Sequence, residues 1–337
     1  APGGLMSKAD AAATVLWIGA TLYTLFGGAD FGGGAWDLVA GGAQRGERPR
    51  ALIQRSLTPV WEANHVWLIF IIVVLWTAFP EAFGALTSTL YVPLALALLG
   101  IVLRGAGFAF RSSIRRLEQR RAMGAVFALS SVLTPFFMGT VVGAVAAGNV
   151  PAEGGGDPFA SWLDPLPLTI GALFVATGAY LAAVFLIGDA RRAGDEELED
   201  YFEHRALLAG IVAGLLAVAA GFVLQEEAPY LYDRLVAEGL PLVAASALCG
   251  LAVLVRLAGG GRRGLRPLAA GAVIAVVWGW GVAQFPYLLP TSLTIGESAA
   301  PDPTLTSLLV VFGVATVVVL PALGLLYWLS QKDLVGE

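Results

Sequence analysis

Apolar stretches long enough to cross a membrane alternate with short polar segments along nearly the whole chain. A membrane-spanning helix needs about 20 mostly apolar residues, and the apolar stretches that meet this length are residues 11–29, 60–79, 84–104, 122–148, 165–188, 206–224, 240–257, 268–288 and 305–329. The pattern predicts an all-α polytopic membrane protein with nine spans, in which residues 1–337 form a single transmembrane domain. Two four-helix bundles and one peripheral helix would account for the nine spans.

The composition agrees with this pattern. Hydrophobic residues make up 57% of the chain and charged residues only 13%, whereas soluble domains contain about 25% charged residues. The single cysteine, Cys249, lies in an apolar run, which excludes a disulfide framework and a thiolate metal site. No basic tract occurs outside the loops and no nucleic-acid-binding motif is present. We therefore expect the chain to contact a lipid membrane and no nucleic acid.

Lysine and arginine are distributed unequally between the two sides of the predicted bundle. Of 20 such residues, only Lys8 and Arg234 lie on the side opposite the loops that follow the first, third, fifth and seventh spans. An excess of Lys and Arg marks the cytoplasmic side of a membrane protein. We therefore expect the N-terminus outside and the C-terminus in the cytoplasm. The mixed-charge segment after the fifth span, DARRAGDEELEDYFEHR, predicts a short solvated helix.

The start of the second span, TPVWEANHVWLIF, holds a carboxylate, an amide and an imidazole: Glu62, Asn64 and His65. A carboxylate in the first turn of a spanning segment is costly, so Glu62 is a candidate functional residue. Glu62 and His65 are three residues apart, which places them on one helix face where they can touch. The alternative is an interfacial carboxylate stabilised by the positive end of the helix dipole and by water.

The first span ends in GGADFGGGAWDL, which the predicted orientation places in the same inner leaflet. Its glycines allow either close backbone contact or a loosened helix. Asp30 and Asp37 lie in this segment, near Glu62. Arg104, at the inner end of the third span, can pair with Asp30 or Glu62, or extend to the membrane surface.

Haem iron takes His, Met or Cys side chains as axial ligands, and the predicted spans contain few of them. His65 is the only histidine in a span, and Met123, Met138 and Cys249 lie on other spans. A bis-His haem held by this chain inside the membrane is therefore excluded, a His/Met haem is disfavoured, and no carboxylate–His cluster suits a di-iron or zinc site. If the protein serves redox chemistry, we expect the redox groups mainly on a partner.

Four motifs occur in a fixed order: GADFGGGAWDL, TPVWEANHVWLIFIIVVLWTAFPEAF, GIVLRGAGFAFR and QFPYLLPTS. The first three lie between about residues 25 and 111, and the last lies at 284–292. Together they resemble subunit II of the cytochrome bd-type quinol oxidases, and the hydropathy profile extends the resemblance over nearly the whole chain. Where many relatives read W-D-G-N-Q-V-W, this chain reads WEANHVW, so Glu62, Ala63 and His65 replace Asp, Gly and Gln.

The resemblance implies a heterodimer of the bacterial cytoplasmic membrane that oxidises quinol and reduces O2 to water. It implies that the haems, two b-type and one d-type or b-type variants, reside in subunit I and that this chain alone binds none. Small single-helix accessory subunits are further partners to expect, and some members hold a structural quinone in subunit II. Residue by residue, Asp30 matches the Asp of the family's D-F/M-G motif and Glu62 the acid of its W-D/E motif. Trp67 matches the Trp near which an oxygen entrance has been proposed.

The hypothesis that follows concerns proton uptake. Reduction of O2 consumes protons, and carboxylates joined by water, His or Asn can relay them through low-dielectric protein. We expect Asp30 and Glu62 on the cytoplasmic uptake side, with Asn64 and His65 as their hydrogen-bond partners.

Two other functions are compatible with parts of the sequence. A secondary transporter would share the glycine-interrupted helix and the buried acids, but its site would lie at the membrane midplane and usually between repeats. A purely scaffolding subunit without a proton role would differ from the first hypothesis only in the behaviour of mutants.

Overall fold

The computed structural model describes residues 6–42, 45–57, 61–113 and 117–331. Its helices are α1 (Lys8–Leu38), α2 (Glu47–Leu57), α3 (Trp61–Ala78), α4 (Pro80–Thr89), α5 (Tyr91–Ser113), α6 (Leu117–Ala146), α7 (Pro165–Arg192), α8 (Glu196–Glu227), α9 (Pro229–Ala237), α10 (Leu240–Ala258), α11 (Leu265–Gln284) and α12 (Asp302–Gln331). Two short strands, β1 (Tyr287–Leu289) and β2 (Leu293–Thr294), pair antiparallel.

Eight of the described helices are long and apolar enough to cross a membrane, and α3 with α4 adds a ninth crossing if this bent pair is one span. Their order matches the predicted stretches, which confirms an all-α polytopic membrane protein. α1 and α8 contain 31 and 32 residues. At 1.5 Å per residue each is about 47 Å long, so both must tilt in or extend beyond a hydrocarbon core of about 30 Å.

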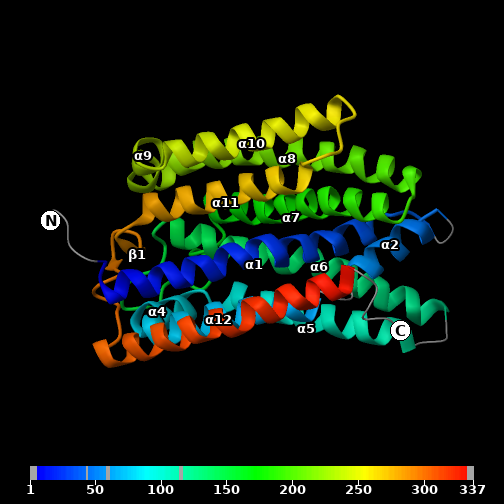
Figure 1. The fold of residues 1–337 in the computed structure, drawn as a ribbon. Helices are drawn as coiled ribbons and strands as arrows, with labels where there is room; N and C mark the ends of the chain where they lie inside the picture. The colour runs from blue at the N-terminus through cyan, green and yellow to red at the C-terminus, as the bar shows by residue number, and fades with distance from the viewer. Residues whose placement is uncertain (1–5, 43–44, 58–60, 114–116, 332–337) are drawn as a thin grey trace.

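The long helices run side by side, with α1 in the middle of the molecule (Figure 1). α1 contacts α3, α6, α7 and α11, and α5 packs on α6. α7, α8, α10 and α11 form a second group in which each helix packs on two others. Two groups of four, joined where α1 and α6 meet α7, therefore account for eight of the described helices. α12 lies at the edge against α1 and α3, and only 6% of its spanning window is buried.

α1 continues as one unbroken helix through the glycine-rich segment to Leu38, beyond the predicted end at residue 29. The glycines allow close packing, because a Cβ on Gly32 would lie 1.9 Å from the main-chain oxygen of Gly178 on α7. α1 and α7 thus meet backbone to backbone at this point. Of the two roles predicted for these glycines, close backbone contact is confirmed and a loosened helix is wrong.

The chain breaks at Phe79, between the predicted spans 60–79 and 84–104, and again at Leu90, inside the second of them. Pro80 occupies the first position of α4, where its missing N–H costs nothing. α4 turns by 118° from α3, and Leu90 separates α4 from α5. The predicted span is therefore wrong at its start, since residues 84–89 belong to α4 and the crossing helix is α5.

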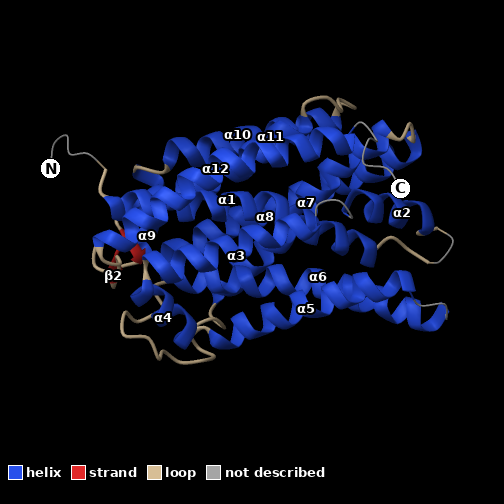
Figure 2. Ribbon diagram, turned by 60° about the horizontal axis from the view of Figure 1, so that its bottom comes forward, coloured by secondary structure: helices blue, strands red, loops and turns tan. Residues whose placement is uncertain are grey.

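The two ends of the bundle differ (Figure 2). The end called here the arginine-rich end comprises α2, the α7–α8 turn and the α10–α11 turn, with Arg48, Arg50, Arg191, Arg192, Arg205, Arg262 and Arg266. The opposite end carries α4, α9 and the β1–β2 hairpin. The predicted solvated helix after the fifth span is wrong as a separate element, because most of that segment forms the first turns of α8. The eighth span ends at Gln284 rather than at residue 288.

Candidate functional site

A buried ion pair between Asp30 of α1 and Arg104 of α5 forms the centre of the candidate site. Each residue is 2% exposed, and Arg104 Nη2 lies 2.6 Å from Asp30 Oδ1. The same Nη2 donates to the main-chain oxygen of Asp30 at 3.2 Å. Of the positions that the sequence allowed for Arg104, the structure shows the one paired with Asp30, away from the membrane surface.

Two aromatic rings and a hydroxyl complete the surroundings of the Arg104 guanidinium. Its central carbon lies 4.8 Å from the ring centre of Phe31 and 5.0 Å from that of Phe127, where a cation is attracted to the ring face. Arg104 Nε donates to Ser131 Oγ at 3.0 Å. Because a guanidinium is weakly hydrated and its donors lie in one plane, arginine suits this dry site better than lysine would.

One carboxylate oxygen of Asp30 lacks a hydrogen-bond partner within the part of the chain that the structure describes. Oδ1 meets Arg104, whereas Oδ2 is buried and unpaired. Leaving a buried acceptor unpaired costs about 1–3 kcal/mol, so a proton or a water molecule at Oδ2 would relieve a real penalty. The carboxylate is thus held by a cation on one side and open on the other.

Asn64 joins α3 to α1 close to this pair. It is 3% exposed, and its Nδ2 donates to the main-chain oxygen of Phe26 at 3.2 Å. Phe26 precedes Asp30 by one helical turn. His65 is half-buried on α3. The side chain of Glu62, and with it the predicted contact between Glu62 and His65, lies outside the described residues.

Trp67 belongs to a different surface of α3. Its ring packs edge-to-face on Phe70 with 6.3 Å between the ring centres, and Phe70 packs on Phe312 of α12 at 5.8 Å. Trp67 is half-buried in this aromatic cluster between α3 and α12. The ion pair, in contrast, lies among α1, α5 and α6.

A second buried carboxylate, Asp37, lies two turns further along α1, at the arginine-rich end. Asp37 is 4% exposed, and Arg50 Nε of α2 lies 3.0 Å from its Oδ1. Arg50 also donates to main-chain oxygens at the end of α1, those of Asp37 and Gly41 at 3.3 and 2.6 Å. The sequence analysis placed Asp37 in the inner leaflet without choosing it as a site residue. The signal was present, because Asp30 and Asp37 are seven residues apart and share one helix face.

A cavity of about 10 Å³ adjoins Asp37, which is at the lower limit for holding one water molecule. Its lining consists of Asp37, Arg50, Ile53, Gln54, Leu57, Phe108 and Phe127. Phe127 therefore touches this cavity and also packs against the Arg104 guanidinium.

Ser131 of α6 is a further polar residue that the sequence analysis missed. It is 1% exposed, accepts a hydrogen bond from Arg104 and donates one to the main-chain oxygen of Phe127 at 2.6 Å. Its hydroxyl lies against Gly34, where a Cβ would be only 2.1 Å from Ser131 Oγ. A serine in a spanning helix gives no signal by itself, since its role depends on neighbours from α1 and α5.

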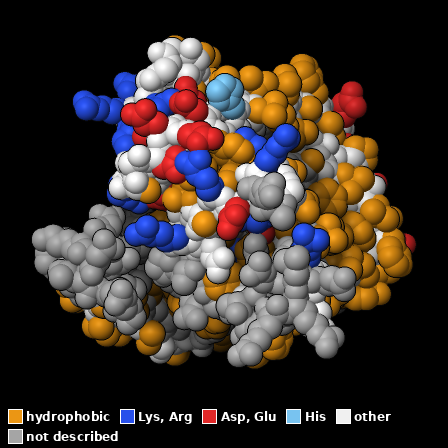
Figure 3. Space-filling view, turned by 90° about the vertical axis from the view of Figure 1, so that its right-hand side faces the viewer, with side chains coloured by type: hydrophobic (Ala, Val, Ile, Leu, Met, Phe, Trp, Pro, Cys, Tyr) orange, Lys and Arg blue, Asp and Glu red, His pale blue; other side chains and the backbone are white. Residues whose placement is uncertain are grey.

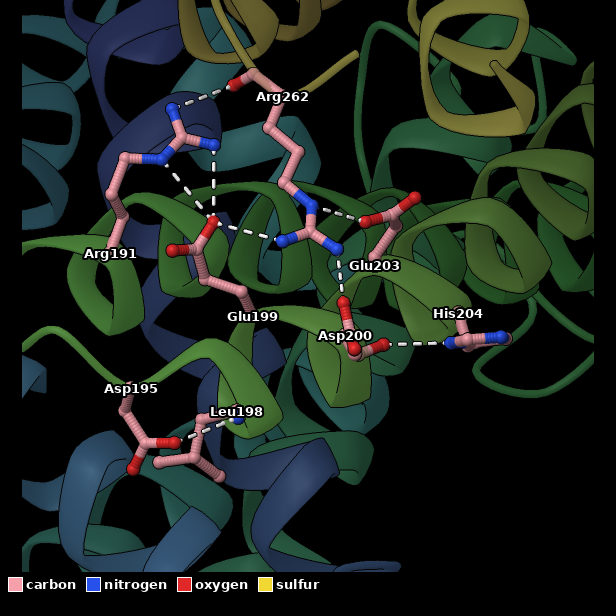
Figure 4. A network of polar contacts seen from close by, with 8 residues as sticks. All are labelled: Arg191, Asp195, Leu198, Glu199, Asp200, Glu203, His204 and Arg262. Atoms are coloured by element: carbon pink, nitrogen blue, oxygen red, sulfur yellow. Dashed lines mark hydrogen bonds and ion pairs between the residues drawn. The ribbon is translucent and has the colours of Figure 1, made fainter. Parts of the chain in front are cut away.

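Charged side chains gather on one part of the arginine-rich end (Figure 3). In the network of Figure 4, Glu199 of α8 is 7% exposed and accepts from Arg191 at 3.2 Å and from Arg262 at 3.4 Å. Arg262 also pairs with Asp200, and with Glu203 at 2.6 Å. The hydrogen bond from Arg262 to Glu203 raises the pKa of Arg262 above its usual range. The network joins the end of α7, the start of α8 and the α10–α11 turn.

The α7–α8 turn depends on Gly194, whose φ of 69° favours glycine. The next residue, Asp195, caps α8 by accepting from the main-chain N–H of Leu198 at 3.0 Å. Arg48 of α2 donates to Asp195 at 2.9 Å. This hydrogen bond is the main cause that lowers the pKa of Asp195 below its usual range.

The donors that could bind a metal or haem are dispersed. Among residues 6–42, 45–57, 61–113 and 117–331, no group of three or more His, Cys, Asp or Glu side chains could hold a metal ion. The sulfur of Met138 accepts from the hydroxyl of Tyr23 at 3.6 Å. Cys249 lies half-buried on α10, which packs on α8, α9 and α11. The described side chains therefore do not fit a haem with both axial ligands from this chain.

The chain matches the family model described as cytochrome bd terminal oxidase subunit II over residues 9–330. A Bacillus subtilis (strain 168) protein with the provisional name cytochrome bd menaquinol oxidase subunit II is 20% identical over 336 residues, covering 96% of this chain and 95% of that protein. Cytochrome bd-I ubiquinol oxidase subunit 2 of Escherichia coli (strain K12) is 30% identical over 104 residues, 31% of this chain and 27% of that protein. A chain in the structure of bd oxidase from Geobacillus thermodenitrificans aligns with a TM-score of 0.77 at 24% identity, over 98% of this chain and 100% of that chain.

Proposed function

Because the chain belongs to the family of subunit II of cytochrome bd terminal oxidases, we propose that its buried polar residues carry protons toward the oxygen-reducing site of the complex. The protein is a multi-pass membrane subunit of a bacterial respiratory quinol oxidase, and membership of the family implies a partner subunit I. Proton uptake from the cytoplasm is the specific role that we assign to this chain.

The haems of the complex supply electron transfer and O2 reduction. Since the described donors of this chain do not offer a pair of axial ligands, no step of the proposal passes through a haem held here. The contribution of this chain is to receive, hold and pass protons.

The observation that carries the proposal is the half-satisfied carboxylate of Asp30. Arg104 fixes Oδ1 at 2.6 Å, while Oδ2 is buried and has no hydrogen-bond partner among the described residues. A carboxylate held in this way has a fixed position and one free oxygen to which a proton or a water molecule can bind. Ionisable residues inside a membrane are costly, and proton relays are among the functions that they serve.

The direction of uptake follows from the distribution of charge. The arginine-rich end corresponds to the side that the Lys and Arg excess predicts to be cytoplasmic. α3 follows α2 in the chain, and Asn64 near its start donates to the main-chain oxygen of Phe26, one turn beyond Asp30 from the arginine-rich end, so we place Asn64 and its neighbours Glu62 and His65 beside Asp30 in the proposed route. We assign Glu62 as a second proton carrier, with Asn64 and His65 as hydrogen-bond partners. An oxygen entrance beside Trp67 is a separate prediction that the proton route does not need.

The test compares Asp30→Asn and Glu62→Gln in the purified complex with subunit I. Each change removes one proton-carrying oxygen and keeps the shape, so we expect quinol oxidase turnover to fall by about 10²–10⁴-fold, the usual effect of removing a positioned acid or base. Haem content, read from the reduced-minus-oxidised visible spectrum, should stay unchanged. Asp10→Asn on the same helix is the matched control, because Asp10 only caps the opposite end of α1.

Loss of the haem signals together with activity would show that Asp30 and Glu62 act in assembly, which is the scaffolding function. Full turnover in both variants would overturn the proton role.

A further inference from the structure

We infer that Asp37 is the inlet carboxylate of the route to Asp30, and that the hydroxyl of Ser131 bridges the two. The inference rests on the proposed function, since it requires protons to pass through Asp30. It adds two residues and a direction to that route.

The first argument is the spacing along α1. Asp30, Gly34 and Asp37 are separated by four and three residues, so they lie one above the other on a single helix face. Seven residues correspond to about 10 Å along the axis. A proton cannot cross that distance in one transfer, so a group between the two carboxylates is needed.

The second argument is the group that occupies this gap. At Gly34 the helix has no side chain, and Ser131 Oγ from α6 fills the space where a Cβ would lie 2.1 Å away. Glycine at this position brings a hydroxyl against the α1 backbone, midway between the two acids. Any other residue at position 34 would push Ser131 away.

The third argument is the hydrogen bonding of Ser131. Its oxygen accepts from Arg104 Nε at 3.0 Å, and its proton is donated to the main-chain oxygen of Phe127 at 2.6 Å. A hydroxyl has one donor and two acceptor positions and can rotate. Ser131 can therefore accept a proton on one side and release its own on the other, next to the ion pair that holds Asp30.

The fourth argument is the cavity beside Asp37. Its volume of about 10 Å³ is at the lower limit for one water molecule, and polar groups of Asp37, Arg50 and Gln54 line it. Phe127 lines this cavity and also packs against the Arg104 guanidinium, so the cavity lies close to the ion pair. Gln54 is exposed and the Arg50 side chain is 24% exposed, so the cavity lies close to the surface of the arginine-rich end.

The proton balance of the route is simple. Protonated Asp37 gives its proton, directly or through a water molecule in the cavity, to the Ser131 oxygen. The Ser131 hydroxyl, which donates to the main-chain oxygen of Phe127 in this structure, turns toward Asp30 Oδ2 and releases its own proton there, and Asp37 is reprotonated from the solvent. No electron moves and no covalent bond between heavy atoms forms or breaks.

A structural role is the competing explanation, because Asp37 also pairs with Arg50 at the end of α1. The experiment must therefore separate proton transfer from loss of an ion pair. We would reduce the complex with quinol, mix it with O2 in a stopped-flow instrument, and follow proton uptake with a pH-indicator dye. The variants are Asp37→Asn, Asp37→Glu and Ser131→Ala, with Asp30→Asn measured in parallel.

Asp189→Asn is the matched control. Asp189 lies at the same end, is 17% exposed, and pairs with Arg266 at 2.6 Å, so its loss also breaks an ion pair there. It lies outside the proposed route.

We expect Asp37→Asn to slow proton uptake by about 10- to 100-fold, at or below the usual effect of removing a positioned acid or base. Asp37→Glu should restore most of the rate, because it keeps the carboxylate, and Asp189→Asn should leave the rate unchanged. Ser131→Ala should slow uptake as well. The KM for quinol should stay constant in all of them.

Normal uptake in Asp37→Asn beside slow uptake in Asp30→Asn would overturn this inference and leave the proposed function intact. Normal uptake in both would overturn the proposed function. If Asp37→Asn fails to assemble, Ser131→Ala decides the question, and an unchanged rate in that variant overturns the inference.

Discussion

When Asp30 and Arg104 are buried, both charges lose their hydration, and hydrogen bonds and aromatic contacts replace the lost water. The guanidinium makes two hydrogen bonds to Asp30 and one to Ser131 and lies near two aromatic rings. Each ring adds about 0.5–2 kcal/mol of cation–π attraction. The pair gains little net stability over apolar residues of the same size, but either charge alone is strongly unfavourable.

This asymmetry predicts the outcome of a double-mutant cycle. Arg104→Met and Asp30→Leu should each destabilise the subunit by about 3–5 kcal/mol, because each leaves the other charge buried without its partner. The combination of Arg104→Met with Asp30→Leu should lose much less. Thermal unfolding of the complex in mild detergent, followed by circular dichroism, measures all three. Additive losses in the double variant would contradict this account.

Among the helices, the contact of α1 with α7 depends on the absence of side chains. The main-chain oxygen of Gly178 occupies the place of a Cβ on Gly32, so the two backbones meet directly. Trp36 strengthens the same contact by donating its Nε1 to the main-chain oxygen of Ala179 at 2.7 Å. α7 belongs to the second group of four helices and α1 to the first, so this contact helps to hold the two groups together.

A methyl group at position 32 should therefore separate α1 from α7. We expect Gly32→Ala to lower stability by about 1–3 kcal/mol, the usual cost of overpacking, and to lower the thermal midpoint of the complex. Gly214→Ala on α8 is the control, because nothing lies within 4 Å of a Cβ there. That change should be neutral or stabilise the helix by up to about 1 kcal/mol. Equal midpoints for Gly32→Ala and wild type would contradict the close contact.

The contact of α2 with α8 predicts a pH dependence. Arg48 lowers the pKa of Asp195 below its usual value of about 3.9, so the folded state favours the charged carboxylate. This contribution is complete above about pH 4 and is lost as the pH falls through the lowered pKa. The difference in thermal midpoint between wild type and Arg48→Gln should be constant from pH 7 to about pH 4 and shrink below it. A difference that grows on acidification would show that Asp195 is not the group involved.

For the whole molecule, the proton route requires one orientation in the membrane, the one that the excess of arginine at one end predicts. Cytoplasmic uptake is possible only if the arginine-rich end faces the cytoplasm. The α7–α8 turn and the loop before α7 lie at opposite ends, and each offers an exposed position, Ala193 and Glu153.

Single cysteines test this orientation in a Cys249→Ala background. A membrane-impermeant maleimide should label Glu153→Cys in intact cells and Ala193→Cys only after the membrane is opened. The reverse pattern would place the arginine-rich end outside and would remove the basis for uptake through Asp37 and Asp30.

Much of this molecule could be predicted from the sequence because the bilayer imposes strict requirements on it. A span needs its length and apolarity in one continuous stretch, so the number, order and class of the helices were readable. Because intramembrane charges need partners or water, the sequence left three environments for Arg104: a pair with Asp30, a pair with Glu62, or the membrane surface. Asp30 could be chosen as a site residue because a carboxylate inside a membrane segment is costly.

The remainder depends on contacts between segments far apart in the chain. The continuation of α1 to Leu38 is stabilised by α7, and the role of Ser131 requires Gly34 and Arg104 from two other helices. The bend at Pro80 looked like an ordinary loop, because a proline at a helix start and a proline after a helix end give the same local signal.

The distance in sequence between Asp30 and Arg104 also has a consequence for biosynthesis. The partners are 74 residues apart, and a ribosome that adds about 5–20 residues per second needs roughly 4–15 s to make that segment. During this interval α1 must remain inserted with an aspartate that costs up to about 2.5–3.5 kcal/mol in the insertion equilibrium, offset by the apolar remainder of the helix. The nascent subunit thus holds an unpaired Asp30 in the membrane at first. The cost of this aspartate is removed when α5 emerges from the ribosome and Arg104 pairs with it.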